Sequence, residues 1–200
     1  MPEGKNLIVG LTGGMGCGKS TAAGLFAEHG FRRHDSDQYI RDVLYRDAAI
    51  VSALAGRLGP DVLTPAGEVW RERVAAKVFG DDAALAWLED LLHPRLLEHW
   101  RAEFAAPGAP WIVEVPLLFE KGLEIWFDFT ICVTADSAQQ LRRLEQRGIP
   151  PELARRRLAK QMPLTRKCEL ADFVLLNDGT LAFLREQVDH LAGRLVAPAP

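Results

Sequence analysis

Apolar and polar positions along the chain change period several times, and these changes predict alternating strands and helices. Short apolar runs, typical of strands buried on both faces, cover four segments: 6–11, 111–119, 127–135 and 171–177. A short second strand is expected at 31–34. Longer stretches with helical spacing lie between them, the first from Ser20 to His29, before Gly30. Such alternation is typical of an α/β fold. We therefore expect a five-stranded, mostly parallel sheet flanked by helices.

The segment between the second and third expected strands is too long for a simple crossover. Most of it has helical periodicity, in the stretches 38–45, 50–58, 68–79 and 84–104. We therefore predict an inserted helical lobe over residues 41–110 and a sheet core formed by residues 1–40 and 111–200. The five tryptophans fall between Trp70 and Trp126. We expect them either to fill the core of the lobe or, for one or two of them, to line an apolar ligand groove.

Composition narrows the class of protein. The chain has 200 residues, of which 48% are hydrophobic, enough for one domain with an inserted lobe. Its formal net charge of −3 provides no general attraction to nucleic acid or to anionic membranes. The three cysteines are odd in number and lack CxxC spacing, which argues against a disulfide framework and a zinc site. With no apolar run of about 18 residues, we expect a soluble, cytoplasmic protein with no nucleic-acid or membrane partner.

The stretch GLTGGMGCGKST, Gly10 to Thr21, carries a phosphate-binding motif. Gly13, Gly18, Lys19 and Ser20 satisfy G-x-x-x-x-G-K-S/T between an expected strand and an expected helix, the context that this motif requires. Residues without Cβ let backbone N–H groups converge on phosphate oxygens, and the helix N-terminus adds positive potential. Lys19 is expected to reach the β- and γ-phosphates, and Ser20 to place its hydroxyl on Mg²⁺. The alternative, a glycine-rich turn without a ligand, leaves the lysine and the hydroxyl without a role.

The rest of the chain indicates how a nucleoside triphosphate would be used. The Asn-Lys-x-Asp base reader of a GTPase is absent from the sequence, and WIVEV offers Glu114 alone instead of the adjacent acids usual in mechanical ATPases. A small-molecule kinase needs a carboxylate that activates the acceptor, near the end of the strand beside the phosphate loop. HDSD supplies Asp35 and Asp37, which would point the same way at a strand end. Capping of the following helix is the alternative.

A basic segment from Gln140 to Gln161 predicts a lid. It holds seven cations and two acids in 22 residues, with a Gly-Ile-Pro-Pro break between two helical halves. A solvated helix face, the alternative, would normally carry alternating glutamates, which are scarce here. We expect a cationic lid, at about residues 140–162, that closes on the transferred phosphoryl group.

The ordered set of motifs resembles the dephospho-coenzyme A kinase family almost from end to end. The set consists of LTGGMGCGKST, DSD with Ile40 and Arg41, Arg71, LLHP ending at Pro94, VPLLFE at 115–120, the arginine-rich lid and ADFVLLNDGT. The resemblance implies a P-loop kinase fold and transfer of the ATP γ-phosphoryl group to the ribose 3′-hydroxyl of dephospho-coenzyme A, the last step of coenzyme A synthesis. ATP and dephospho-coenzyme A are then the substrates and Mg²⁺ the cofactor. We expect a monomer or weak homo-oligomer.

The resemblance also implies roles for individual residues. The catalytic residues would be Asp37 as general base, with Lys19 and Arg143. The ATP-binding residues would be Gly13, Gly14, Met15, Gly16, Cys17, Gly18, Lys19, Ser20, Thr21, Arg147, Asn177 and Gly179, with the segment 177–179 beside the adenine. The acceptor-binding residues would be Asp35, Arg71, His93, Leu117, Arg157 and Gln161, in a lobe that binds the acceptor. Ser20 would be the metal ligand. Capping of the helix before Pro94 is the alternative for His93.

The sequence departs from the family pattern at three positions. Cys17 stands where serine is usual and Met15 where isoleucine is common, but both positions offer backbone, so nucleotide binding is expected to persist. Cys17 lies beside Lys19 and a helix N-terminus, so we expect its thiolate to be favoured, alkylating reagents to label it and ATP to protect it. Glu114 is expected either to contact Mg²⁺ through water or to be buried and hydrogen-bonded to the lobe. Alternative functions are another nucleoside or nucleotide kinase and a nucleotide-gated binding protein with slow ATP hydrolysis.

Overall fold

The computed structural model describes residues 6–78 and 80–196. The chain divides into two compact units, a sheet unit with the residues up to Asp35 and from Pro107 onward, and a helical unit, Ser36–Ala106. The sequence pattern placed these boundaries near residues 41 and 110. Asp37, which that pattern assigned to the sheet core, therefore lies at the start of the helical unit.

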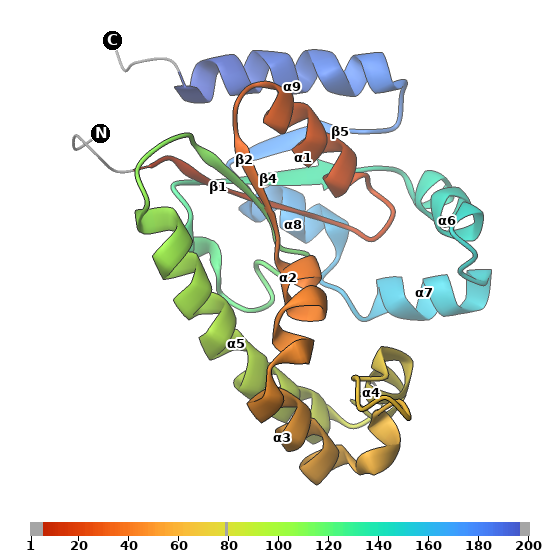
Figure 1. The fold of residues 1–200 in the computed structure, drawn as a ribbon. Helices are drawn as coiled ribbons and strands as arrows, with labels where there is room; N and C mark the ends of the chain where they lie inside the picture. Colours follow the sequence, from red (N-terminus) through yellow and green to blue (C-terminus); the bar gives the residue numbers. More distant parts are fainter. Residues whose placement is uncertain (1–5, 79, 197–200) are drawn as a thin grey trace. The chain divides into compact units, whose positions relative to one another are not determined.

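The sheet unit is built on five parallel strands in the order β2-β3-β1-β4-β5 (Figure 1). The strands are β1 (Ile8–Gly13), β2 (Arg32–Asp35), β3 (Trp111–Glu114), β4 (Phe129–Thr134) and β5 (Phe173–Leu176). Leu11 pairs with Glu114 on one side and with Ile131 on the other, and Asp35 pairs with Glu114. The carboxyl ends of β1, β2 and β3 therefore meet at one edge of the sheet. The prediction of a five-stranded, parallel α/β fold is confirmed.

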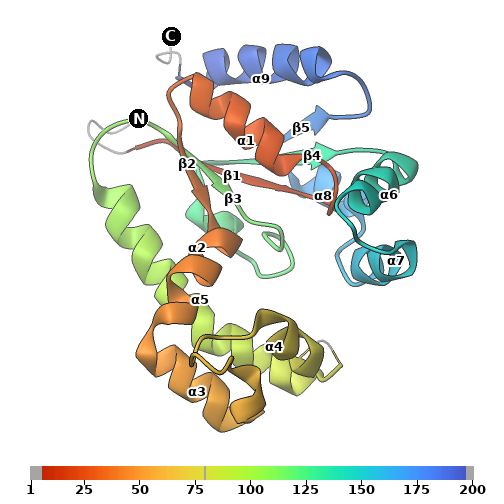
Figure 2. The same ribbon diagram turned by 45° about the vertical axis from the view of Figure 1, so that its right-hand side comes forward.

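Helices cover both faces of this sheet (Figures 1 and 2). The helices of this unit are α1 (Lys19–Glu28), the 3-10 helix η3 (Glu124–Trp126), α6 (Ser137–Gln146), α7 (Pro151–Ala159), α8 (Leu164–Leu170) and α9 (Leu181–Val196). Helices α1 and α9 lie side by side on one face, and α8 lies on the other. The predicted lid segment forms α6 and α7 with a break at residues 147–150, so its division into two helical halves is confirmed.

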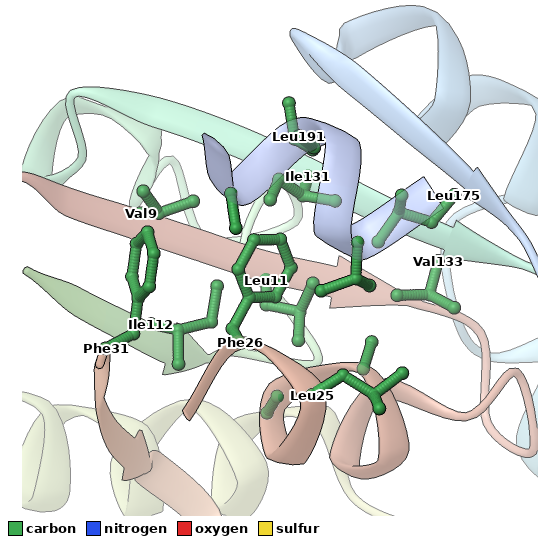
Figure 3. Close-up of a cluster of buried hydrophobic side chains, with 14 of the residues drawn as sticks. Val9, Leu11, Leu25, Phe26, Phe31, Ile112, Ile131, Val133, Leu175 and Leu191 are labelled. Atoms are coloured by element: carbon green, nitrogen blue, oxygen red, sulfur yellow. The ribbon is translucent and has the colours of Figure 1, made fainter. Parts of the chain in front are cut away.

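Strand alternation sorts the side chains of the sheet between these faces. Val9 and Leu11 of β1 and Ile131 of β4 face the same side, where they pack with Phe26 of α1 and Leu191 of α9 (Figure 3). Each such fully buried apolar side chain contributes about 1.5–3 kcal/mol to folding. Because residues two apart in a strand share a face, the intervening side chains point to the α8 side. The strand that runs into the glycine-rich loop is thus held from both faces.

The third strand is shorter than its apolar run predicts. The run 111–119 was expected to be one strand, but β3 ends at Glu114. The Val115 N–H still donates to the Leu11 carbonyl oxygen at 2.9 Å. Pro116 has no N–H to continue the ladder, and the chain turns away through residues 116–122. The apolar run continues past the end of the strand because the turn is also packed against the sheet, where Leu118 is fully buried.

The helical unit has a separate hydrophobic core. Its elements are α2 (Ser36–Asp42), η1 (Leu44–Arg46), α3 (Ala48–Leu58), η2 (Pro60–Val62), α4 (Arg71–Val78) and α5 (Asp82–Ala105). Ile50 and Leu54 of α3 pack there with Val74 of α4 and Leu88 of α5. The helix expected over 68–79 begins at Arg71, and Phe79 lies outside the described residues. Among the described helices, none has both the length and the apolarity needed to cross a membrane.

The five tryptophans are divided between the two units. Trp70, Trp87 and Trp100 belong to the helical unit, and Trp111 and Trp126 to the sheet unit. Trp100 is fully buried, whereas Trp70 is 37% exposed beneath the Arg73 guanidinium, whose carbon lies 4.0 Å from the ring centroid. The interpretation that all five fill the core of the lobe is therefore wrong for Trp111 and Trp126, because β3 and η3 of the sheet unit supply them.

Candidate active site

The glycine-rich loop joins β1 to α1 and is fixed by close packing of its backbone. Gly13 has φ +140°, and a Cβ there would lie 2.2 Å from the Val133 carbonyl oxygen. Gly18 has φ +95°, and its Cβ would lie 2.2 Å from Nδ2 of Asn177. Any larger residue at either position would clash and also adopt an unfavourable backbone conformation. The motif glycines are therefore required by the shape of the loop.

Lys19 is the first residue of α1 and lies over this loop. Its Nζ donates to the carbonyl oxygens of Gly13 at 3.0 Å and Gly14 at 3.1 Å. Gly18 is the N-cap of α1 and has no side chain to accept from the first-turn N–H groups. An ammonium group and an N-terminal helix turn that lacks a side-chain cap together form an anion-binding arrangement.

Two side chains of the sheet unit brace the loop from outside it. Nδ2 of Asn177 donates to the Cys17 carbonyl oxygen at 2.8 Å. Arg143 of α6 donates through Nη1 to the Gly16 carbonyl oxygen at 3.3 Å and through Nη2 to that of Asn177 at 2.9 Å. Both residues were expected at the nucleotide site, and the structure brings both against the phosphate loop. Their hydrogen bonds hold the carbonyl groups of Gly16 and Cys17 in place.

The end of the predicted lid also reaches the loop. Oε1 of Gln161 accepts a hydrogen bond from the Met15 N–H at 3.2 Å. The sequence assigned Gln161 to the acceptor, so its contact with the phosphate loop is new information. Gln140 was missed altogether, although it is buried, donates to the Ala135 carbonyl oxygen at 2.8 Å and limits the space at Gly14. A lone glutamine in a basic helix carries no sequence signal for such a role.

The other expected residues of the sheet unit lie on exposed positions. Thr21 follows Ser20 in the first turn of α1, and Gly179 lies in the turn between β5 and α9. Arg147 ends α6, and Arg157 lies on α7. Leu117 is 37% exposed in the turn after β3. None of these positions is constrained by packing in the way that the motif glycines are.

Ser20 and Glu114 place two oxygen ligands at the carboxyl edge of the sheet. Glu114 is 3% exposed, and its Oε2 accepts a hydrogen bond from Oγ of Ser20 at 2.9 Å. Its Oε1 accepts from Nε of Arg33 at 2.8 Å, and Nη2 of Arg33 is 2.7 Å away. The ion pair balances the buried charge. A hydroxyl and a carboxylate are the oxygen ligands that Mg²⁺ prefers, so the residues present fit this cation.

The two acids of HDSD do not lie on one strand. Strand β2 ends at Asp35, and α2 begins at Ser36, so Asp37 lies in the first turn of a helix. The prediction that the two carboxylates point the same way at a strand end is therefore wrong, because the period of two stops where the helix begins. Asp37 is exposed, and its negative charge is favourable at a helix N-terminus.

Within the helical unit, the charges of Asp37 and Arg71 both influence the phenol of Tyr45. Burial raises the pKa of the Tyr45 phenol, the nearby charge of Arg71 lowers it, and the charge of Asp37 raises it further. Two residues from separate motifs, 34 positions apart, thus act on one hydroxyl. Sequence analysis missed Tyr45, whose only signal was its place at the end of the stretch 38–45.

Comparison with known proteins identifies the group to which this chain belongs. The family model described as "Dephospho-CoA kinase" matches residues 7–182. The chain belongs to the dephospho-CoA kinase family. It is accordingly an ATP-dependent phosphotransferase, and its reaction completes coenzyme A synthesis.

Relatives and solved structures match this kinase over nearly the whole length of its chain. The dephospho-CoA kinase of Corynebacterium glutamicum is 37% identical over 196 residues, which cover 96% of this chain and 98% of the relative. A crystal structure of a Thermus thermophilus protein has a TM-score of 0.83 and 32% identity, covering 96% of this chain and 100% of its own. The dephospho-CoA kinase of Campylobacter jejuni shares the fold, with a TM-score of 0.64 and 20% identity. The match covers 95% of this chain and 97% of that protein.

Cys17 of this kinase does not have the reactive environment that its neighbours suggested. Its side chain is fully buried, and burial raises the pKa of the thiol despite the opposing charges of Lys19 and Arg143. The expectation of a favoured thiolate that alkylating reagents label is therefore wrong. Lys19 lies two residues further along the chain, but its ammonium donates to the loop carbonyls, whereas the thiol packs in the hydrophobic core. Desolvation outweighs the nearby charge.

His93 of the kinase is inside a helix and not at its end. Helix α5 continues through Pro94 to Ala105, so the capping interpretation is wrong. His93 and Pro94 line a cavity of about 340 Å³ together with Asp90, Leu97 and Arg101, all within the helical unit. A contact between His93 and the acceptor stays a prediction.

Proposed function

We propose that this kinase transfers the γ-phosphoryl group of ATP to the ribose 3′-hydroxyl of dephospho-coenzyme A, with Asp37 as the general base. The observation that carries the proposal is the edge of the sheet where β2 ends beside β3. Asp35 pairs there with Glu114, whose carboxylate accepts from Ser20. Two residues of chain span at most about 7 Å. Asp37 follows this edge of the sheet by only two residues of chain.

The nucleotide end of the reaction relies on the loop. Backbone N–H groups of residues 13–18 and the N-terminus of α1 would bind the phosphates, and Lys19 would move from the loop carbonyls to the β- and γ-phosphate oxygens. Ser20 and Glu114 would hold Mg²⁺, which when bound supplies positive charge against the phosphate oxygens. Arg143 already lies against the loop and would stabilise charge on the transferred group.

The acceptor end relies on the helical unit. Asp37 would accept the proton of the ribose hydroxyl, and Arg71 would orient the acceptor near it. The common influence of both on Tyr45 supports a shared location for them. Exposed cations of α7, Arg155, Arg156 and Arg157, would cover the transferred group and exclude water. The cytoplasmic location and a monomeric or weakly self-associating state stay predictions.

A panel of acceptors tests the proposal. Steady-state ADP release and product formation are measured with dephospho-coenzyme A, AMP, CMP, UMP and adenosine. We expect dephospho-coenzyme A to be the best acceptor. AMP should lose turnover as well as affinity, because binding energy from the pantetheine arm aligns the hydroxyl. A nucleoside monophosphate as best acceptor would indicate a different nucleotide kinase, and ADP release that no acceptor stimulates would indicate a slow ATPase.

A further inference from the structure

Lys167 is a fully buried lysine that the phosphoryl-transfer mechanism does not use. It lies in the middle of α8 with 0% exposure. Its Nζ donates to the Pro116 carbonyl oxygen at 2.6 Å and lies 2.8 Å from Oε1 of Glu120. Lysine is among the residues least often buried, because its ammonium must leave water. The cost of burying this charge is offset only by its hydrogen bonds and the opposite charge beside it.

The two partners of Lys167 belong to the turn that follows β3, and each leads to the phosphate loop. The Pro116 carbonyl oxygen also accepts from Oγ1 of Thr12 at 3.3 Å, and Thr12 immediately precedes the loop. Oε1 of Glu120 also accepts the N–H of Met162 at 3.0 Å. The buried ammonium is thus bonded to one turn, and the turn is bonded both to the strand before the loop and to the last residue of the lid segment.

The connection continues from Met162 to the loop itself. Gln161, the preceding residue, accepts from the Met15 N–H at 3.2 Å. The carboxyl end of the lid segment is therefore held between Glu120 on one side and the phosphate loop on the other. The arginines of α7 precede this point by only a few residues.

We propose that Lys167 and Glu120 form the fixed anchor of the lid, and that Lys167 is a positioning residue for phosphoryl transfer. The inference rests on the proposed function of the lid and adds what holds its carboxyl end. The pair fixes the position of Met162, and through it Gln161 and the distance from the α7 arginines to the phosphate loop. The pair suits this task because the same carboxylate oxygen, Oε1 of Glu120, meets the Lys167 ammonium and accepts the Met162 N–H.

The test compares the full-length wild type with a variant that removes both charges, Lys167→Met/Glu120→Leu. Removal of both avoids leaving one charge unpaired, which would by itself strongly destabilise the fold. The matched control is Arg166→Met, which removes the neighbouring cation on the same helix. Arg166 also forms an ion pair, with Glu169 at 2.8 Å, but both side chains are more than half exposed.

Three measurements separate an anchor from a merely structural pair. The kcat/KM for ATP is measured per folded molecule, with the folded fraction taken from circular dichroism. The ratio of ADP released to coenzyme A formed reports hydrolysis by water. Limited trypsin digestion after Arg155–Arg157, with and without a non-hydrolysable ATP analogue, reports whether the nucleotide orders the lid.

The double variant should fold and lose about tenfold to a hundredfold in kcat/KM for ATP, because misplacement by about an ångström has that effect. Its ratio of ADP to product should rise, and the analogue should no longer protect the lid. Arg166→Met should match the wild type within about twofold. A folded double variant with wild-type kinetics, coupling and protection would overturn the anchor, as would losses that follow only the folded fraction. Absence of transfer to dephospho-coenzyme A in the wild type would instead overturn the proposed function.

Discussion

The phosphate loop and the helical unit hold their candidate residues in opposite ways. In the loop, Gly13, Gly14 and Gly16 are buried, and the groups offered to a ligand are mainly backbone. In the helical unit, Asp37 and Arg71 are exposed side chains in the first turns of α2 and α4. The nucleotide end thus depends on packing and the acceptor end on side-chain chemistry. Substitutions at the two ends should therefore change different measured quantities.

The largest expected effect is at the acceptor end. Asp37→Asn keeps the size of the side chain and removes the base, so turnover should fall by about two to four orders of magnitude while ATP affinity changes little. Turnover is measured by product formation with dephospho-coenzyme A. Asp82→Asn is the matched control, since Asp82 is also an exposed acid in the first turn of a helix, α5. Normal turnover in Asp37→Asn would assign the base to another residue.

Lys19→Ala should have the second-largest effect on turnover. It tests a residue at the end of the loop that acts through its side chain. Loss of the ammonium should lower turnover by about a hundredfold or more. The hydrogen bonds that Lys19 donates to loop carbonyls are modest, so the free energy of unfolding should change by less than about 1 kcal/mol. Urea unfolding and steady-state kinetics check the two halves of this prediction. Retained activity in the folded variant would end the assignment of Lys19.

Gly18→Ala alters the loop without removing any functional side chain. The new Cβ would lie 2.2 Å from Nδ2 of Asn177 at a backbone φ of +95°. This backbone conformation costs alanine roughly 1–2 kcal/mol more than glycine. Because ATP binding requires the loop in this shape, the cost should appear as about a tenfold loss of ATP affinity. Gly24→Ala, further along α1 with no neighbour within 4 Å of its Cβ, should instead stabilise the helix by up to about 1 kcal/mol. The affinity of each variant for an ATP analogue is measured by calorimetry. Equal affinities of Gly18→Ala and Gly24→Ala would contradict this prediction.

The smallest effect should come from Cys17→Ser, because the loop uses only the backbone of this residue. ATP affinity should stay within about twofold of the wild type. Burial raises the pKa of Cys17 and of Cys132, so at neutral pH both are protonated and their reactivity grows only as the pH rises toward those values. Iodoacetamide followed by mass spectrometry should therefore label the partly exposed Cys168 first. Rapid labelling of Cys17 in the folded protein would show that its side chain faces the site.

The sequence predicted the parts of this site that are continuous in the chain. The phosphate loop, the strand before it and the two helices of the basic segment 140–161 each have a local pattern that physical chemistry interprets without long-range information. The errors arose at transitions between elements. Asp37 was assigned to a strand, and the third strand was extended past Pro116, because apolar and polar periods do not mark where one element ends and the next begins.

What the sequence by itself determined is the α/β alternation, the glycine-rich phosphate loop and the two helices of the basic segment 140–161, since each depends on residues within about twenty positions of one another. Tertiary structure alone decided which distant residues support them. Glu114 meets Ser20 across 94 positions, Asn177 reaches Cys17 across 160, and Lys167 is buried against Pro116 across 51. A buried charge is stable only beside its partners, and no local pattern records where a partner 50 or more positions away will be folded.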